Sequence, residues 1–211
     1  GNGGMLCLND NALYQRGKLL RSWGRSSSLY SDSESIENRF DIQIDDIVYD
    51  KKFIFSELGY NIEPSEMGAA FGLVQLKKLK NNIRLREKNF KQHYAFFKPY
   101  EEFFILPHQL KKSHTGWLAF ALTVKENAPF TRTDMQIYLE KQNIQTRTVF
   151  TGNILRQPGF RNIPCKQNQN GYQEADRVMR GGILLGCHHG LTQEQIDYMH
   201  EIIEQFIKQY R

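Results

Sequence analysis

The stretch PSEMGAAFGLVQLKKLKNNIRLREKNFKQHYAFFKP, residues 64–99, decides how this chain is organised. Ser65 is a favourable N-cap, Glu66 suits the positive end of a helix dipole, and Pro99 cannot continue a helix. The sequence therefore predicts one long helix from Ser65 to Lys98. Apolar residues recur along it at helical spacing, and we expect this stripe to be buried. The stripe consists of Leu73, Leu76, Leu79, Ile83 and Phe90.

The first turns of this helix are thin, because they contain Gly68, Ala69, Ala70 and Gly72. Glycine lowers the intrinsic stability of a helix. A closely packed partner is therefore the expected compensation. That partner is either another helix of the same chain or a second subunit.

Beyond Pro99 short apolar runs alternate with helical patterns. Strands are expected at residues 103–106, 117–124, 144–150 and 183–187. Thr131 with Asp134, and Thr192 with Gln195, have the spacing of helix-capping boxes, and a shorter helix is expected at 174–179. The last helix should bury Ile196, Met199, Ile203, Phe206 and Ile207. The alternation predicts a small two-layer α/β domain.

The residues before the long helix read differently. Met5 to Leu8 form an apolar run short enough for a buried strand. Asp10 can cap a helix that Gly24 would end. The segment 26–50 is polar, acidic and rich in serine, and we interpret it as an irregular excursion with a short strand at 40–44.

Composition and charge narrow the possible partners. Hydrophobic residues make up 40% and charged residues 24% of the 211 residues, as in ordinary globular proteins. Much of the formal net charge of +5 lies in the basic run at residues 77–91. That run lacks the interleaved aromatics that stack on bases, so we expect no nucleic-acid partner. No apolar run reaches the about 20 residues of a membrane helix, so no membrane partner is expected.

Cysteine usage indicates a reducing compartment. Cys7, Cys165 and Cys187 have an odd count and no metal-site spacing. The sequence CHHG at 187–190 does not change this, because adjacent histidines on a strand point to opposite faces. We expect no metal ion and a cytoplasmic location.

Three stretches could bind a ligand. The loop after RTVF holds Thr151, Asn153, Arg156 and Gln157 at a strand exit, where ligands are often bound. Arg156 could form a forked contact with a phosphate or a carboxylate; the alternative is a polar surface loop. Asn61 is either a turn residue or a donor to a ligand. GNGG at residues 1–4 favours a tight turn over a phosphate cradle.

Six stretches occur in order along the chain: GNGGML, LLRSWGR, YDKKFIFSELGYN, SEMGAAFGLVQLKKL, RTVFTGNILRQPGF and GLTQEQIDY. Together they resemble the C-terminal half of the DegT/DnrJ/StrS family of PLP-dependent sugar aminotransferases. YDKKFIFSELGYN and TGNILRQP resemble its nucleotide-ketosugar 3-dehydrase branch, found in lipopolysaccharide sugar pathways. The resemblance implies an α/β fold in three parts. These are the tail of the large cofactor-binding domain at 1–65, a bridging helix at 66–98 and a small C-terminal α/β domain at 99–211.

The resemblance also implies roles for particular residues. The residue that forms the Schiff base with PLP, lysine in the aminotransferases and histidine in the dehydrases, is expected upstream of Gly1. The chain on its own is therefore expected to lack a catalytic residue and to be inactive. Asn61 matches an asparagine that binds the cofactor phosphate of the neighbouring subunit, which implies a homodimer with shared active sites. Asn153 and Arg156 match a loop that faces the nucleotide-sugar.

The expected activity is aminotransfer to a nucleotide-linked ketosugar, with PLP or PMP as cofactor and glutamate as amino donor. Dehydrases that use a [2Fe–2S] cluster have cysteines directly after WGR, whereas this chain has Ser26, Ser27 and Ser28. Serine cannot supply thiolate ligands, so no cluster is expected. Asn2, Glu63 and Pro64 also depart from the usual family residues. The alternatives are a cluster-free, PMP-dependent 3-dehydrase and a non-catalytic fragment or interaction module.

Overall fold

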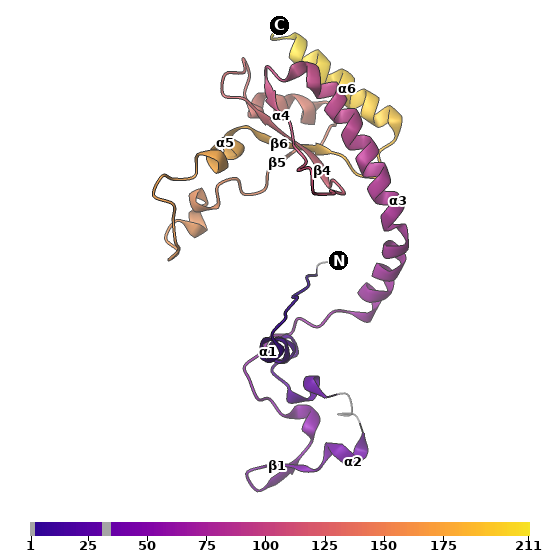
Figure 1. The fold of residues 1–211 in the computed structure, drawn as a ribbon, viewed down its shortest axis with the longest axis vertical. Coiled ribbons are helices and arrows are strands. Elements are labelled where there is room, and N and C mark those ends of the chain that lie inside the picture. Colours follow the sequence, from indigo (N-terminus) through magenta and orange to yellow (C-terminus); the bar gives the residue numbers. More distant parts are fainter. Residues whose placement is uncertain (1–2, 31–34) are drawn as a thin grey trace. The chain divides into compact units, whose positions relative to one another are not determined.

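The computed structural model describes residues 3–30 and 35–211 and has two compact units, residues 1–76 and 77–211 (Figure 1). Helix α3 (Glu66–Phe97) contributes to both units and is followed by the 3-10 turn η3 (Lys98–Tyr100). The predicted long helix is confirmed to within one residue at each end. Over the described ranges, no helix is both long and apolar enough to cross a membrane.

Unit 1 begins with a segment that we expected to be a strand, and that prediction is wrong. The segment from Met5 to Leu8 has no regular secondary structure, and Met5 is 91% exposed. A strand needs a neighbouring strand to take its backbone hydrogen bonds, and no described strand pairs with this segment. The Leu6 and Leu8 side chains lie over Gly17 of the following helix instead.

That helix, α1 (Asn11–Arg21), has the predicted N-cap. The Asp10 carboxylate accepts a hydrogen bond of 2.9 Å from the Leu13 N–H. At the other end the Gly24 N–H donates to the Leu19 carbonyl, and Gly24 has a φ of +81°. Trp23, with a φ of 57°, is left-handed as well, so the helix ends through this pair of residues, one of which is the predicted Gly24.

The polar segment after α1 is an excursion made of short elements. They are η1 (Ser26–Leu29), α2 (Ile36–Arg39), β1 (Ile42–Ile44), β2 (Ile47–Tyr49) and η2 (Lys51–Phe53). Strands β1 and β2 form an antiparallel hairpin in which Ile44 faces Ile47. The expected short strand is present as β1, whereas its partner β2 was not predicted.

The excursion leaves and rejoins the rest of unit 1 through a narrow neck. A Cβ atom on Gly24 would stand 1.8 Å from the Glu57 carbonyl oxygen, and one on Gly59 would stand 2.2 Å from the Gly24 nitrogen. Only glycine allows two backbones to approach so closely. Bonds from Ser56 N–H to Gly24 O and from Trp23 N–H to Tyr60 O close the neck.

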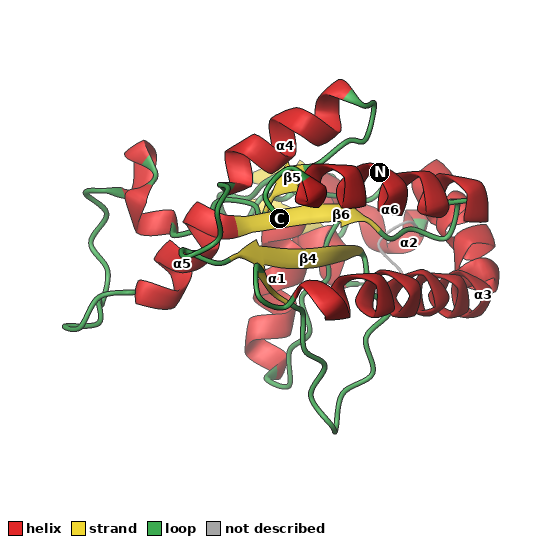
Figure 2. Ribbon diagram, turned by 90° about the horizontal axis from the view of Figure 1, so that it is seen from above, coloured by secondary structure: helices red, strands yellow, loops and turns green. Residues whose placement is uncertain are grey.

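Unit 2 contains a four-stranded antiparallel sheet in the order β3-β4-β6-β5 (Figure 2). The strands are β3 (Phe104–Ile105), β4 (Ala119–Val124), β5 (Arg147–Thr148) and β6 (Gly182–Gly186). The helices are α4 (Arg132–Lys141), α5 (Gln173–Gly181), α6 (Gln193–Lys208) and the C-terminal part of α3. The predicted α/β arrangement is confirmed. Strand β5 is shorter than the expected strand at 144–150, and Phe150 within that range has a left-handed backbone conformation that a strand cannot continue through.

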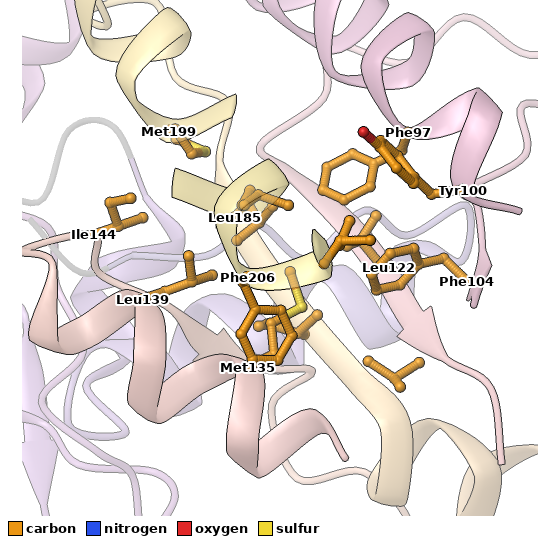
Figure 3. Packing of buried hydrophobic residues seen from close by; sticks show 14 of the residues in the cluster. Phe97, Tyr100, Phe104, Leu122, Met135, Leu139, Ile144, Leu185, Met199 and Phe206 are labelled. Atoms are coloured by element: carbon orange, nitrogen blue, oxygen red, sulfur yellow. The ribbon is translucent and has the colours of Figure 1, made fainter. Parts of the chain in front are cut away.

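The core of unit 2 lies between one face of the sheet and three helices. Strand β4 buries Phe120, Leu122 and Val124 on one face, in the alternation typical of a sheet with one covered side. Figure 3 shows α4, α6 and the end of α3 contributing to this cluster. All five predicted core residues of α6 are buried, together with Ile202. Both predicted capping boxes, Thr131–Asp134 and Thr192–Gln195, are present.

The predicted burial of the first half of α3 is wrong. Leu73 and Leu76 are each 64% exposed and Leu79 is 44% exposed. The apolar spacing marks a face of the helix, but in the described part of the chain these three side chains of that face remain largely exposed. The buried residues of α3 are Asn89, His93 and Phe97.

A pair of histidines joins α3 to α6 inside unit 2. His93 Nε2 lies 3.0 Å from the Gly186 carbonyl oxygen and therefore donates to it. His93 Nδ1 must then accept the hydrogen bond of 2.9 Å from His200 Nε2. Burial lowers the pKa of His93, and burial together with the neighbouring His93 lowers the pKa of His200 to about 4.

The histidine pair predicts acid sensitivity of unit 2. An unfolded histidine binds its proton near pH 6.5, whereas folded His200 does so only near pH 4. The folded state binds fewer protons in this window, so the free energy of unfolding should fall as the pH drops from about 6.5 to 4. His200→Gln should make the fall smaller, measured by denaturant unfolding at pH 7 and pH 5. The exposed-site control His108→Gln should leave it unchanged; an equal fall in both variants would contradict the assignment.

Candidate functional site

Asn61 is held on a fixed backbone at the end of unit 1. It forms an isolated antiparallel bridge with Ser22, just after α1. The Tyr60 N–H donates to Leu20 O at 2.7 Å and the Ile62 N–H donates to Arg21 O at 3.1 Å. The Asn61 side chain is exposed and makes no hydrogen bond with any described residue. Its carboxamide is thus positioned by the backbone and available to a ligand.

A polar cavity of about 320 Å³ lies in the same unit. It is lined by Arg21, Ser22, Arg25, Ser27, Ser28, Lys52, Phe53 and Glu63. Arg21 Nε lies 3.3 Å from a Glu63 carboxylate oxygen, so these two residues form an ion pair at its edge. Basic side chains around one cavity suit an anionic ligand.

Two of the three serines after WGR connect the two sides of the excursion, and the third bonds locally. Ser26 Oγ donates to the Ile54 carbonyl at 3.3 Å and Ser27 Oγ donates to the Lys52 carbonyl at 3.4 Å. Ser28 Oγ donates to the Arg25 carbonyl at 2.7 Å. The hydroxyl groups therefore act as local structural donors.

The second candidate site is a cluster in unit 2 around Asp176. Asn153 is 8% exposed, and its amide donates to Asp176 Oδ1 at 2.7 Å while its carbonyl oxygen accepts from the Leu155 N–H. Arg156 donates from Nε and Nη2 to the two Asp176 oxygens, each at 2.5 Å. The hydrogen bonds from Arg156 and Asn153 hold the pKa of Asp176 far below its usual value. The structure thus brings Asn153 and Arg156 together on one carboxylate.

This geometry makes Arg156, but not Asn153, available to bind a ligand. The buried Asn153 amide is occupied in fixing the loop through the 3-10 turn η4 (Ile154–Arg156). The Arg156 side chain is exposed, and its Nη1 makes no hydrogen bond within the described ranges. Arg156 can therefore offer a donor to a ligand while Asp176 fixes the plane of its guanidinium group.

Sequence reasoning missed several residues of these sites. Asp176 lies in the first turn of α5, and only the fold reveals that it meets a loop 20 positions earlier. Arg21 and Arg25 are contained in LLRSWGR, but no spacing rule predicts that they line a cavity with Lys52.

Comparison with protein families decides the identity of the chain. A model of the DegT/DnrJ/EryC1/StrS aminotransferase family matches residues 1–204. The chain belongs to this family. The match extends over both compact units, and it confirms the resemblance drawn from the six sequence stretches.

Two curated proteins are similar to this chain over almost its whole length. The chain is 31% identical over 209 residues to the lipopolysaccharide biosynthesis protein RfbH of Salmonella typhimurium, covering 98% of this chain and 48% of that protein. It is 26% identical over 204 residues to the GDP-4-keto-6-deoxy-D-mannose 3-dehydratase of Escherichia coli O55:H7, covering 96% of this chain and 50% of that protein. The chain spans about half the length of the curated relatives it matches.

Solved structures share the fold over about half of their own length. The E. coli GDP-4-keto-6-deoxy-D-mannose-3-dehydratase with bound hydrated PLP superposes with a TM-score of 0.75 at 24% identity, over 92% of this chain and 48% of that one. An aminotransferase from Psychrobacter cryohalolentis superposes with a TM-score of 0.68 at 16% identity, over 96% of this chain and 50% of that one. The fold is that of PLP-dependent aminotransferases.

Proposed function

We propose that the full-length protein is a PLP- or PMP-dependent enzyme that acts on a nucleotide-linked ketosugar during the synthesis of a surface polysaccharide. The family match over residues 1–204 carries this proposal. The names of the relatives support the substrate class, since they include a lipopolysaccharide biosynthesis protein and nucleotide-ketosugar 3-dehydratases.

The residues present fit the phosphate of such a cofactor. Asn61 has an exposed carboxamide on a backbone fixed by the Ser22 bridge, and an amide N–H can donate to a phosphate without adding charge. In this proposal Asn61 holds the phosphate of the cofactor bound in the neighbouring subunit, so that a homodimer shares its active sites. When bound, the cofactor supplies an electron sink next to the sugar carbonyl.

The proposed role of the Asn153–Arg156 loop is to orient the nucleotide-sugar. Asn153 and Asp176 fix the loop, and Arg156 presents its remaining donor to a phosphate or sugar oxygen. Binding and orientation are thus the contributions that we propose for the residues of this chain.

The position of Arg156 can be tested through substrate affinity. Arg156→Ala should raise KM for the nucleotide-sugar by about ten-fold, as expected for loss of a charge-assisted hydrogen bond, with a smaller change in kcat. Arg156→Lys should not restore KM, because lysine lacks the planar fork that Asp176 orients. Arg161→Ala removes an exposed arginine of the same loop and should leave KM unchanged; a KM equal to that of Arg156→Ala would contradict the role.

The reaction itself is proposed to be aminotransfer, with glutamate as the amino donor. A second candidate, cluster-free 3-dehydration, is favoured by the relatives that are named 3-dehydratases. Full-length protein incubated with a nucleotide-linked 4-ketosugar, PLP and glutamate distinguishes them by mass spectrometry. Aminotransfer leaves nitrogen on the sugar, whereas 3-dehydration leaves a ketosugar with one oxygen fewer. No sugar product and no 2-oxoglutarate would overturn both and favour an interaction module.

A further inference from the structure

The cavity in unit 1 contains an arginine whose donors are incompletely used. Arg25 Nε is buried and has no hydrogen-bond acceptor among the described residues. Its Nη2 lies 3.4 Å from Ser22 Oγ, which is a long contact. Within residues 3–30 and 35–211, no carboxylate forms an ion pair with Arg25. A partly buried guanidinium without an anion is unfavourable unless a ligand supplies one.

The Arg25 side chain is also fixed in position. Its guanidinium carbon lies 4.5 Å from the centre of the Trp23 ring, in a cation–π contact. Its contact Ser22 is 3% exposed and is held by the bridge to Asn61. A donor fixed before binding loses little conformational entropy when a ligand arrives.

Two further basic residues reach the cavity from separate elements. Arg21 ends α1 and Lys52 lies on η2, while Glu63 is the acidic residue that completes the lining with Arg21. The volume of about 320 Å³ falls within the range of small-ligand cavities, about 300–1,000 Å³. Basic groups that converge from three segments on one cavity indicate a binding site for an anion.

We propose that this cavity binds a phosphate group, with Arg25 as the principal donor and Arg21 and Lys52 as supporting cations. Guanidinium groups match phosphate oxygens through two parallel hydrogen bonds. The source of the phosphate rests on the proposed function: it is either the diphosphate of the nucleotide-sugar or the phosphate of the cofactor. Both sources present the same chemistry to Arg25.

The proposal is tested by isothermal titration calorimetry, which measures the affinity of the full-length protein for inorganic pyrophosphate. Arg25→Gln should weaken binding about ten-fold or more, because it removes a charged fork. Arg16→Gln is the matched control, since Arg16 lies on α1, pairs with Glu57 and does not line the cavity. Equal affinities of the wild type and Arg25→Gln, or no binding by the wild type, would overturn the proposal.

Lys52→Gln provides a second variant in case Arg25→Gln does not fold, and it should also weaken pyrophosphate binding. Separate titrations with a nucleoside diphosphate and with PLP identify the source, because Arg25→Gln should weaken only the ligand that occupies the cavity. Weakening of neither ligand would overturn the proposal. Neither titration requires turnover. Phosphate binding without any sugar product would therefore contradict the proposed function but support the phosphate site. A sugar product without phosphate binding in the cavity would contradict the phosphate site but support the proposed function.

Discussion

Asn61→Ala in the full-length protein should weaken the retention of PLP while leaving the fold intact. A hydrogen bond to an ionised group contributes about 1.5–3 kcal/mol, which corresponds to about a 10–100-fold loss of affinity. The fold should survive because the local pairing uses the backbone at residues 60–62, whereas the Asn61 side chain is exposed. Equilibrium dialysis against PLP, with circular dichroism of the same samples, measures both effects.

A matched control and a mixing experiment test whether Asn61 acts across subunits. Asn170→Ala removes an exposed amide from unit 2 and should not change PLP retention. Subunits carrying Asn61→Ala, mixed with subunits inactivated at the residue that forms the Schiff base in the full-length enzyme, should form dimers with one intact composite site. Activity should then recover in part. Heterodimers that form without any recovery would show that Asn61 does not serve a neighbouring subunit.

Phe206→Ala should be among the most destabilising single changes in unit 2. Phe206 is 2% exposed on α6, and its ring lies 4.9 Å from that of Phe130, measured between ring centres. It also packs against Tyr138 and Tyr210 (Figure 3 shows its place in the cluster). Removing a buried phenyl ring leaves a cavity and costs about 3–5 kcal/mol. Denaturant unfolding of the full-length protein, monitored by far-UV circular dichroism, measures this loss.

The control for this variant is Phe150→Ala. Phe150 is 79% exposed, so its removal leaves no cavity and should change the free energy of unfolding by less than about 0.5 kcal/mol. If Phe206→Ala and Phe150→Ala had the same free energy of unfolding, the described packing of α6 against the sheet would be contradicted.

The predictions from sequence succeeded where the evidence for an element was local. The Asp10 cap of α1 and the two capping boxes depend on residues three positions apart, and the structure confirms all of them. The buried face of α6 was also predicted, because the sheet that covers it belongs to the same unit. The same periodicity predicted that Leu73 and Leu76 are buried, and this prediction is wrong. Periodicity identifies the apolar face of a helix, but it does not show what covers that face.

For the candidate sites too, the sequence predicts single residues but not the tertiary contacts between them. The sequence identifies Asn61, Asn153 and Arg156 as candidates, but it does not predict which residues surround them. The ion pair with Asp176 joins residues 20 positions apart, and the cavity around Arg25 draws on residues from Arg21 to Glu63. Contacts of this kind arise from tertiary folding, and no spacing along the chain encodes them.

The glycine neck at Gly24 and Gly59 has a consequence for how this region can change in evolution. Because the backbones touch there, the excursion leaves and rejoins the rest of unit 1 as a loop whose two ends are fixed. The entropy of closing a loop varies slowly with length, by about 0.6 kcal/mol for each doubling. The hairpin of β1 and β2 could therefore lengthen, shorten or be exchanged between homologues at little thermodynamic cost. The two glycines at the neck would have to be inherited unchanged, since any side chain there would separate the strands that close it.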